Sequence, residues 1–194
     1  MSTETESVDL VGEETTVNVA RAVVFAAVTA ATSPINATHP LAQGIPITLQ
    51  TLWVYLAGLV LGPVWGVASF ALYLVAGTVG LPVFAGGSGG VGVLFGKTGG
   101  YLVGFVLAAG VIGLVAHGRR GIRHPGDVGV PRLVAALVAG SAVIYACGAL
   151  GLMAVLGVGP VVAVTTGVLP FLPVGAVKVA AAVGIAKSDA IVPR

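Results

Sequence analysis

The sequence predicts an all-α protein that crosses a membrane several times, with about six transmembrane helices. Of its 194 residues, 57% are hydrophobic and 8% are charged, and the mean hydropathy is +1.06. A water-soluble domain of this size needs a more polar composition to cover its surface. Several apolar stretches also follow one another, each close to the length of about 17–25 residues that a helix needs to cross a hydrocarbon core.

Six apolar stretches, separated by polar residues or by Pro and Gly, define an expected membrane domain at 19–187. The expected spans are 19–33, 47–61, 64–81, 98–117, 131–156 and 161–186. Only Gly62-Pro63 separates the second span from the third, so we expect these two to form a helical hairpin. In the sixth span, Pro170 and Pro173 are expected to break or kink the helix before it reaches Lys178.

The two ends of the chain are expected to be short and polar. Residues 1–18 are acidic and polar, unlike a secretory signal sequence, and are predicted to form a disordered tail. Residues 188–194 are predicted to form a short cytoplasmic tail. The single cysteine, Cys147, lies in an apolar stretch and has no second cysteine with which to form a disulfide in the chain.

The charged residues predict the orientation of the chain in the membrane. With the N-terminus in the cytoplasm, seven of the nine basic residues fall on the cytoplasmic side, as membrane proteins prefer. They are Arg21, Arg119, Arg120, Arg123, Arg132, Lys187 and Arg194. All seven acidic residues fall on the same side, namely Glu4, Glu6, Asp9, Glu13, Glu14, Asp127 and Asp189. We therefore expect a multi-pass protein of the cell membrane, surrounded by lipid, with both termini in the cytoplasm.

Two lysines lie apart from this cytoplasmic set, Lys97 just before the fourth span and Lys178 inside the sixth. A lysine inside a membrane costs about 2.5–3.5 kcal/mol on insertion scales and usually faces a cavity and a partner. No acidic residue of the chain is expected near Lys178, so an external anion is the favoured partner. The alternatives are that the Lys178 stem snorkels to the headgroups or that its amine is deprotonated inside the bundle.

The outer loops are apolar and rich in Gly and Pro, a composition typical of lids that pack over a ligand. The loop after the first span leads into Thr48 and Gln50, which are candidate polar contacts. The loop after the third span has a glycine-rich centre, GGSGGVG, which favours a lid, a re-entrant segment or a flexible connector. Gly96-Lys97-Thr98 is no phosphate-binding loop, because Val91 stands where that motif needs its first glycine.

The fourth span opens KTGGYLVGF, in which Gly99, Gly100 and Gly104 favour the close approach of another helix. Tyr101 in the same motif offers a ring and a hydroxyl. It is a candidate for a ligand contact, although tyrosines at this depth also form the aromatic belt at the membrane interface.

The first span carries small residues on one face, with Ala22, Ala26 and Ala30 at four-residue spacing and Ala27 and Ala31 on an adjacent stripe. Such a face packs closely against a helix, either of the same chain or of a partner subunit.

An intramembrane enzyme would need catalytic groups inside a span, usually His, Asp or Glu. The three histidines, His39, His117 and His124, lie outside the expected spans or at their ends, and no acidic residue lies within one. We therefore expect neither an enzyme nor catalytic residues.

Five motifs occur in order along the chain: ARAVVFAAVTAA, IPITLQTLWVYLAGLVLGPVWG, LYLVAGTVGLPVFAGG, GKTGGYLVGF and PFLPVGAVK. Together they resemble the BioY family, from about Ala20 to Lys187. BioY proteins are the substrate-specific S components of energy-coupling factor (ECF) vitamin transporters. The resemblance implies an S-component-like bundle of six helices with a Gly-rich outer loop, which captures biotin from outside. The resemblance does not imply a cofactor, a metal site or a nucleic-acid partner.

The resemblance also implies partner subunits. Import would be driven by ATP and would need an ECF transmembrane coupling subunit and two cytoplasmic ATPase subunits. By analogy with the small-residue face on which S components dock, Ala22, Ala26 and Ala30 are expected to contact the coupling subunit.

Lys178 matches the lysine of the family's P-F-x-P-x-D-x-x-K motif, where it serves the carboxylate of the ligand. The other substrate-binding residues expected from these motifs are Lys97, Tyr101, Gln50, Thr98, Phe84, Gly100 and Phe171. The sequence departs from the family at two positions. Gly175 replaces the motif's Asp, the expected partner of the ureido ring, and Lys97 replaces the Pro of G-P-T-G-G-Y.

Because of these departures, the identity of the ligand has two interpretations. The first is biotin, and the alternative is another vitamin or an anionic biotin precursor. If the ligand is biotin, another group must replace the lost carboxylate, because an unpaired buried ureido group costs about 1–3 kcal/mol. Gln50, Thr98, Tyr101 and backbone carbonyls are the expected substitutes.

Overall fold

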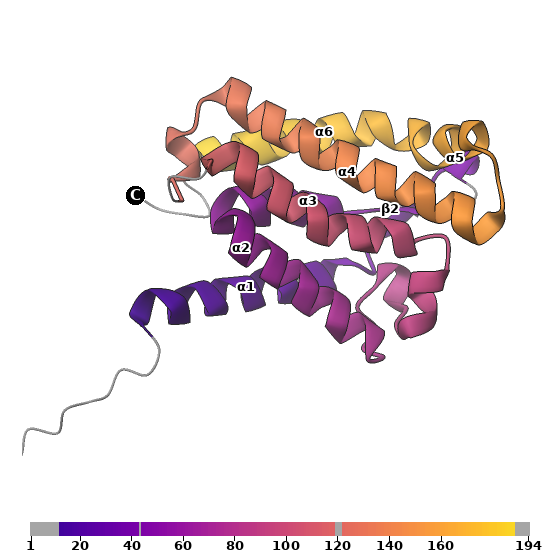
Figure 1. Ribbon diagram of the computed structural model, residues 1–194, viewed down its shortest axis with the longest axis horizontal. Coiled ribbons are helices and arrows are strands. Elements are labelled where there is room, and N and C mark those ends of the chain that lie inside the picture. Colours follow the sequence, from indigo (N-terminus) through magenta and orange to yellow (C-terminus); the bar gives the residue numbers. More distant parts are fainter. Residues whose placement is uncertain (1–11, 43, 119–121, 189–194) are drawn as a thin grey trace, which may run out of the picture.

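The chain folds into a bundle of helices that run back and forth between two ends (Figure 1). The structure is a computed structural model and describes residues 12–42, 44–118 and 122–188. In chain order its elements are α1 (Glu13–Thr32), β1 (Asn36–Thr38), the 3₁₀ turn η1 (Pro40–Ala42), β2 (Pro46–Thr48), α2 (Gln50–Thr78), η2 (Ala85–Gly87), η3 (Val91–Phe95), α3 (Gly99–His117), η4 (Pro125–Asp127), α4 (Val130–Leu156), α5 (Pro160–Gly167), η5 (Leu169–Phe171) and α6 (Leu172–Lys187).

Five helical stretches of the described chain are long and apolar enough to cross a membrane. They are Glu14–Thr32, Gln50–Thr78, Gly99–His117, Val130–Leu156 and Pro160–Lys187. The second consists of two arms, because Gly62 in its middle has φ 72° and ψ −173°, outside the helical region. Gln50 donates a hydrogen bond from Nε2 to the hydroxyl of Tyr73, which a straight helix would hold about 35 Å away. The predicted reversal at Gly62-Pro63 is therefore confirmed, and the bundle has about six segments.

The remaining helices follow the predicted spans closely, and the predicted break in the last span is found. There α5 ends at Gly167, η5 contains Pro170, and α6 begins at Leu172. Helix α1 differs from the prediction, because it begins at Glu13 and makes residues 13–18 helical rather than disordered. A glutamate in the first turn, here Glu14, favours a helix by its interaction with the helix dipole. The rest of the two predicted tails, residues 1–11 and 189–194, lies outside the described residues.

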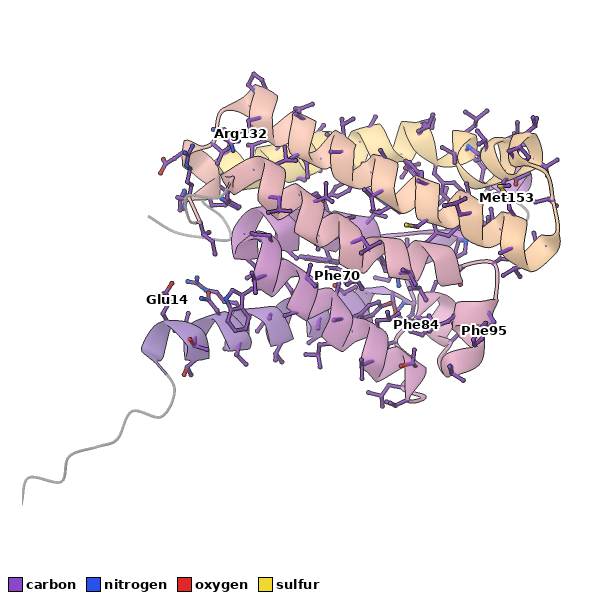
Figure 2. All side chains as sticks on the ribbon, in the orientation of Figure 1. Glu14, Phe70, Phe84, Phe95, Arg132 and Met153 are labelled. Atoms are coloured by element: carbon purple, nitrogen blue, oxygen red, sulfur yellow. The ribbon has the colours of Figure 1, made fainter. Side chains whose placement is uncertain are left out.

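The two ends of the bundle differ in composition, and we name them the charged end and the loop end. The loop end holds β1, β2, η2, η3 and the turn between α4 and α5 (Figure 1). The charged end holds the start of α1, the reversal in α2, η4 and the end of α6 (Figure 1). Lys187 there donates from Nζ to the carbonyls of Gly126 and Val128, both at 2.7 Å. Arg132, labelled in Figure 2, donates from Nε to the carbonyl of Val115 at 2.7 Å. These contacts join the end of α6 to η4 and the start of α4 to α3.

His117 is a buried polar residue at the charged end, 1% exposed. Its Nδ1 accepts a hydrogen bond from the backbone N–H of Arg123 at 3.1 Å, so Nε2 carries the proton. Nε2 donates it to the carbonyl of Leu59 at 2.8 Å. The end of α3 is thereby tied both to the first arm of α2 and to the loop that follows.

Helix α3 lies at the centre of the bundle, between α2 and α4. A Cβ added at Gly104 would lie 3.1 Å from the Cα of Ile144, so the predicted close approach of another helix is found, and the helix is α4. On its other side, Phe105 packs edge to face against Phe70 of α2, with ring centroids 6.2 Å apart. Phe70 is labelled inside the bundle in Figure 2.

Candidate functional site

A cavity opens at the loop end, with an empty volume of about 640 Å³ that includes open solvent. Strands β1 and β2, which pair antiparallel with Asn36 opposite Thr48, bring the loop after α1 over it. The lining residues come from six parts of the chain and are Ile45, Pro46, Ile47, Thr48, Gln50, Thr51, Phe84, Ala85, Thr98, Tyr101, Leu102, Phe105, Ile144, Tyr145, Phe171, Val174, Gly175 and Lys178.

Lys178 supplies the positive charge of the cavity. Its Nζ donates hydrogen bonds to the backbone carbonyl of Thr48 and, at 2.6 Å, to Oγ1 of Thr51. An ammonium group has three N–H donors, so one remains for a ligand. Within the described residues Lys178 forms no ion pair with a carboxylate. The cavity therefore carries an uncompensated cation and favours an anionic ligand.

Gln50 anchors a buried polar network beside Lys178. Its side chain is 3% exposed and accepts a hydrogen bond on Oε1 from Thr48 Oγ1 at 2.8 Å. Its Nε2 donates to the hydroxyl of Tyr73, which in turn donates to the carbonyl of Val83 at 2.8 Å. The network joins β2, both arms of α2 and the loop before η2, so it holds the cavity wall in place.

Aromatic rings form the apolar walls of the cavity. Phe84 is 1% exposed and packs edge to face against Tyr73, with centroids 5.6 Å apart. Figure 2 places Phe84 inside the molecule, whereas Phe95 lies farther out at the loop end. Tyr101 and Phe171 pack with centroids 6.3 Å apart, and the Tyr101 hydroxyl donates to the carbonyl of Gly167 at 2.7 Å. Such walls suit the apolar part of a small ligand.

Six of the eight residues expected to bind substrate line this cavity, namely Lys178, Gln50, Thr98, Tyr101, Phe84 and Phe171. Lys97 and Gly100 do not line it. The Lys97 side chain is exposed, and Gly100 faces α4, where an added Cβ would lie 3.1 Å from the Cα of Gly151. The substrate-binding roles of all eight residues remain predictions.

Tyr145 and Thr51 are polar lining residues that the sequence did not reveal as candidates. Thr51 lies close in the sequence to Thr48 and Gln50, the predicted polar contacts. This proximity could have identified it as a candidate. Tyr145 lies within the apolar stretch SAVIYACGAL, where the pattern does not show which face is turned inward.

The expected docking stripe on α1 needs correction. Ala22 and Ala26 are only 5% and 6% exposed, and Ala30 is partly buried. The carbonyl of Ala22 accepts a hydrogen bond from Ser69 Oγ of α2 at 2.8 Å. These alanines therefore pack inside the chain, which was the alternative reading of the pattern. The adjacent Ala27 and Ala31 are exposed.

The fold and the cavity define a polytopic integral membrane protein with a cavity at one end whose lining includes the cation Lys178. The chain belongs to the BioY family, whose sequence model matches residues 3–193. The predicted family is thus confirmed.

Two named relatives match nearly three quarters of the chain. The probable biotin transporter BioY of Pyrococcus horikoshii is 41% identical over 143 residues, which cover 74% of this chain and 79% of the relative. The biotin transporter BioY of Rhodobacter capsulatus is 39% identical over 148 residues, covering 72% and 76%.

A solved structure shares the fold. It is the crystal structure of the S-component for biotin from an ECF-type ABC transporter, with a TM-score of 0.75 and 22% sequence identity. The match covers 92% of this chain and 93% of that one. The predicted S-component-like bundle is therefore confirmed as the fold.

Proposed function

We propose that this chain is the substrate-binding membrane subunit of a biotin uptake transporter, and not an enzyme. It would capture biotin at the loop end for ATP-driven import by an ECF-type coupling module. The names of its BioY relatives support biotin as the cargo. The observation that carries the proposal is Lys178, a cation with one remaining N–H donor in a cavity whose other walls are apolar, aromatic or neutral.

Biotin fits the chemistry of this cavity. Its carboxylate matches the Lys178 ammonium, and charge-assisted hydrogen bonds of this kind are about twice as strong as neutral ones. Its hydrocarbon chain and sulfur-containing ring match the walls formed by residues such as Phe84, Phe105 and Ile144. Its polar ureido ring needs hydrogen-bonding partners, which the tyrosine and threonine hydroxyls and the backbone carbonyls offer.

The test is a binding titration of detergent-purified protein with labelled biotin. Saturable binding of one biotin per chain is expected, and its absence would overturn the proposal. Competition by a panel of other vitamins and of anionic biotin precursors, each unlabelled, decides the alternative ligands. Biotin is expected to compete best.

The proposed orientation places the loop end outside the cell and the charged end, with both termini, in the cytoplasm. Arg123, Arg132 and Lys187 support it, because basic residues accumulate on the cytoplasmic side of membrane proteins. In this orientation the binding domain at 19–187 is embedded in lipid, and its cavity opens toward the external supply of biotin.

The proposed partners are an ECF transmembrane coupling subunit and two cytoplasmic ATPase subunits. We place the contact with the coupling subunit on the exposed small-residue face of α1, at Ala27 and Ala31, since Ala22 and Ala26 are occupied within the chain. Small residues on a helix surface permit close approach of a second helix in a membrane.

Bulky residues on this face are expected to reduce biotin transport without changing biotin binding. Ala27→Leu with Ala31→Leu is expected to reduce biotin uptake several-fold in cells that contain the coupling module, while biotin binding by the purified subunit stays unchanged. Ala26→Leu is the contrasting variant, because its side chain would enter the packing against α2 and lower the stability of the subunit itself. Unimpaired uptake by the double variant would exclude this face as the docking surface.

A further inference from the structure

Tyr145 of α4 reaches the backbone of α6 at Gly175. A Cβ added at Gly175 would lie 2.6 Å from the Tyr145 hydroxyl oxygen, closer than such atoms ever approach. The same hydroxyl lies 3.3 Å from the carbonyl oxygen of Phe171, to which it donates. Tyr145, Gly175 and Phe171 all line the cavity. The absence of a side chain at position 175 thus leaves the space in which a phenol oxygen lies at the cavity wall.

The hydrogen-bonding state of this hydroxyl determines what it can offer a ligand. Its single proton is directed to the Phe171 carbonyl, so only its lone pairs remain. Toward the cavity, Tyr145 therefore acts as an acceptor and selects for an N–H or O–H donor on the ligand.

The other tyrosine that lines the cavity is placed differently. The Tyr101 hydroxyl donates to the carbonyl of Gly167, and a Cβ added at Gly167 would lie 2.6 Å from it. Gly167 belongs to α5 and is not part of the cavity wall. The polar atom of Tyr101 therefore points toward α5, whereas that of Tyr145 lies between two lining residues.

The acceptor and the cation make their contacts with different elements. Gly175 and Lys178 lie three residues apart in α6 and so share one face of the helix. The Lys178 stem carries its Nζ to Thr48 and Thr51, at β2 and the start of α2. The Tyr145 hydroxyl stays against the α6 backbone. A ligand that satisfies both groups needs an anionic group and an N–H donor.

We propose that Tyr145 is a specificity-determining residue that accepts a hydrogen bond from a ureido N–H of biotin, and that Gly175 is required to make room for its hydroxyl. This inference rests on the proposed function. The family motif has an Asp for the ureido ring where this chain has Gly175 on α6. The inference assigns that contact to the phenol of Tyr145 on α4 instead.

The experiment compares biotin binding by Tyr145→Phe and Gly175→Ala with the wild type. Loss of one buried hydrogen bond is expected to weaken binding about 10-fold in Tyr145→Phe, and Gly175→Ala should have a similar effect by displacing the hydroxyl. In the double variant the alanine should add little, because its Cβ would lie 3.8 Å from Tyr145 Cζ, an ordinary contact. Fully additive losses would show that Gly175 acts independently of the hydroxyl and would overturn its assigned role.

Tyr55→Phe is the matched control. Its hydroxyl also contacts α4, at Ser141 Oγ over 2.5 Å, but Tyr55 does not line the cavity. Removal of this hydroxyl is expected to leave biotin affinity unchanged, so that a loss confined to Tyr145→Phe reports a contact with the ligand rather than a general weakening of the helix contact.

A biotin analogue methylated on its ureido nitrogens tests which part of the ligand contacts Tyr145. The wild type is expected to prefer biotin over this analogue more strongly than Tyr145→Phe does, by the same factor of about 10. An unchanged preference, or unchanged affinity for biotin in Tyr145→Phe, would overturn this inference while leaving the proposed function intact. Absence of biotin binding by the wild type would instead overturn the proposed function.

Discussion

Replacement of Lys178 with methionine is expected to weaken biotin binding by about 100-fold or more, the largest effect of any single substitution in the cavity. Methionine keeps an unbranched side chain of similar length but removes the three N–H donors and the charge. The carboxylate of biotin would then enter a cavity whose remaining polar groups are neutral, with no counter-charge among the residues that line it. Titration of the purified variant with labelled biotin measures the effect.

Lys187→Met is the matched control for this substitution. Lys187 lies on the same helix and, like Lys178, donates two hydrogen bonds to oxygen atoms, but it does so at the charged end. Its loss is expected to leave biotin affinity unchanged. The methyl ester of biotin supplies a second contrast, since the wild type should prefer biotin strongly and Lys178→Met should show little preference. Equal discrimination by both proteins would contradict the ionic role of Lys178.

The positions of these two lysines illustrate what the sequence can predict in this chain. A charged residue inside an apolar stretch is rare enough to be noticed without a structure, because its burial is costly unless a partner is present. The reversal at Gly62-Pro63 and the break near Pro170 were also predictable, because the effects of Gly and Pro on the backbone are local. Charge and backbone chemistry therefore predicted the number of segments and the main cation of the cavity.

The orientation of each helix about its own axis was not predictable in the same way. In a soluble helix, polar residues mark the exposed face, but in α1 and α4 both the lipid-facing and the buried side are apolar. The sequence therefore led to Ala22 rather than Ala27 as part of the docking face, although Ala22 is buried and Ala27 is exposed. Tyr145 was missed for the same reason, because its contact with Gly175 depends on how α4 is rotated against α6.

Gly62→Ala is expected to destabilise the protein by about 2–3 kcal/mol, because a Cβ at this position strains the backbone. With φ 72° and ψ −173°, Gly62 occupies a backbone region that residues with a Cβ almost never adopt. A Cβ there would also lie 2.9 Å from Cγ1 of Ile122. The measurement is the free energy of unfolding, or the thermal midpoint, of the purified protein in detergent. Gly184→Ala in α6 is the control, since no atom lies within 4 Å of the added Cβ, and it should be neutral or slightly stabilising.

The reversal at Gly62 also bears on the binding site, although the two lie at opposite ends of the bundle. The Gln50 to Tyr73 hydrogen bond joins the far ends of the two arms at the cavity, so the turn and the cavity wall belong to one folded unit. The proposed site exists only in the folded form, so a saturating concentration of biotin is expected to raise the midpoint of Gly62→Ala. Lys178→Met in the same background should abolish that rise. A midpoint that biotin raises equally in both variants would mean that the ligand stabilises the bundle through a site other than the Lys178 cavity.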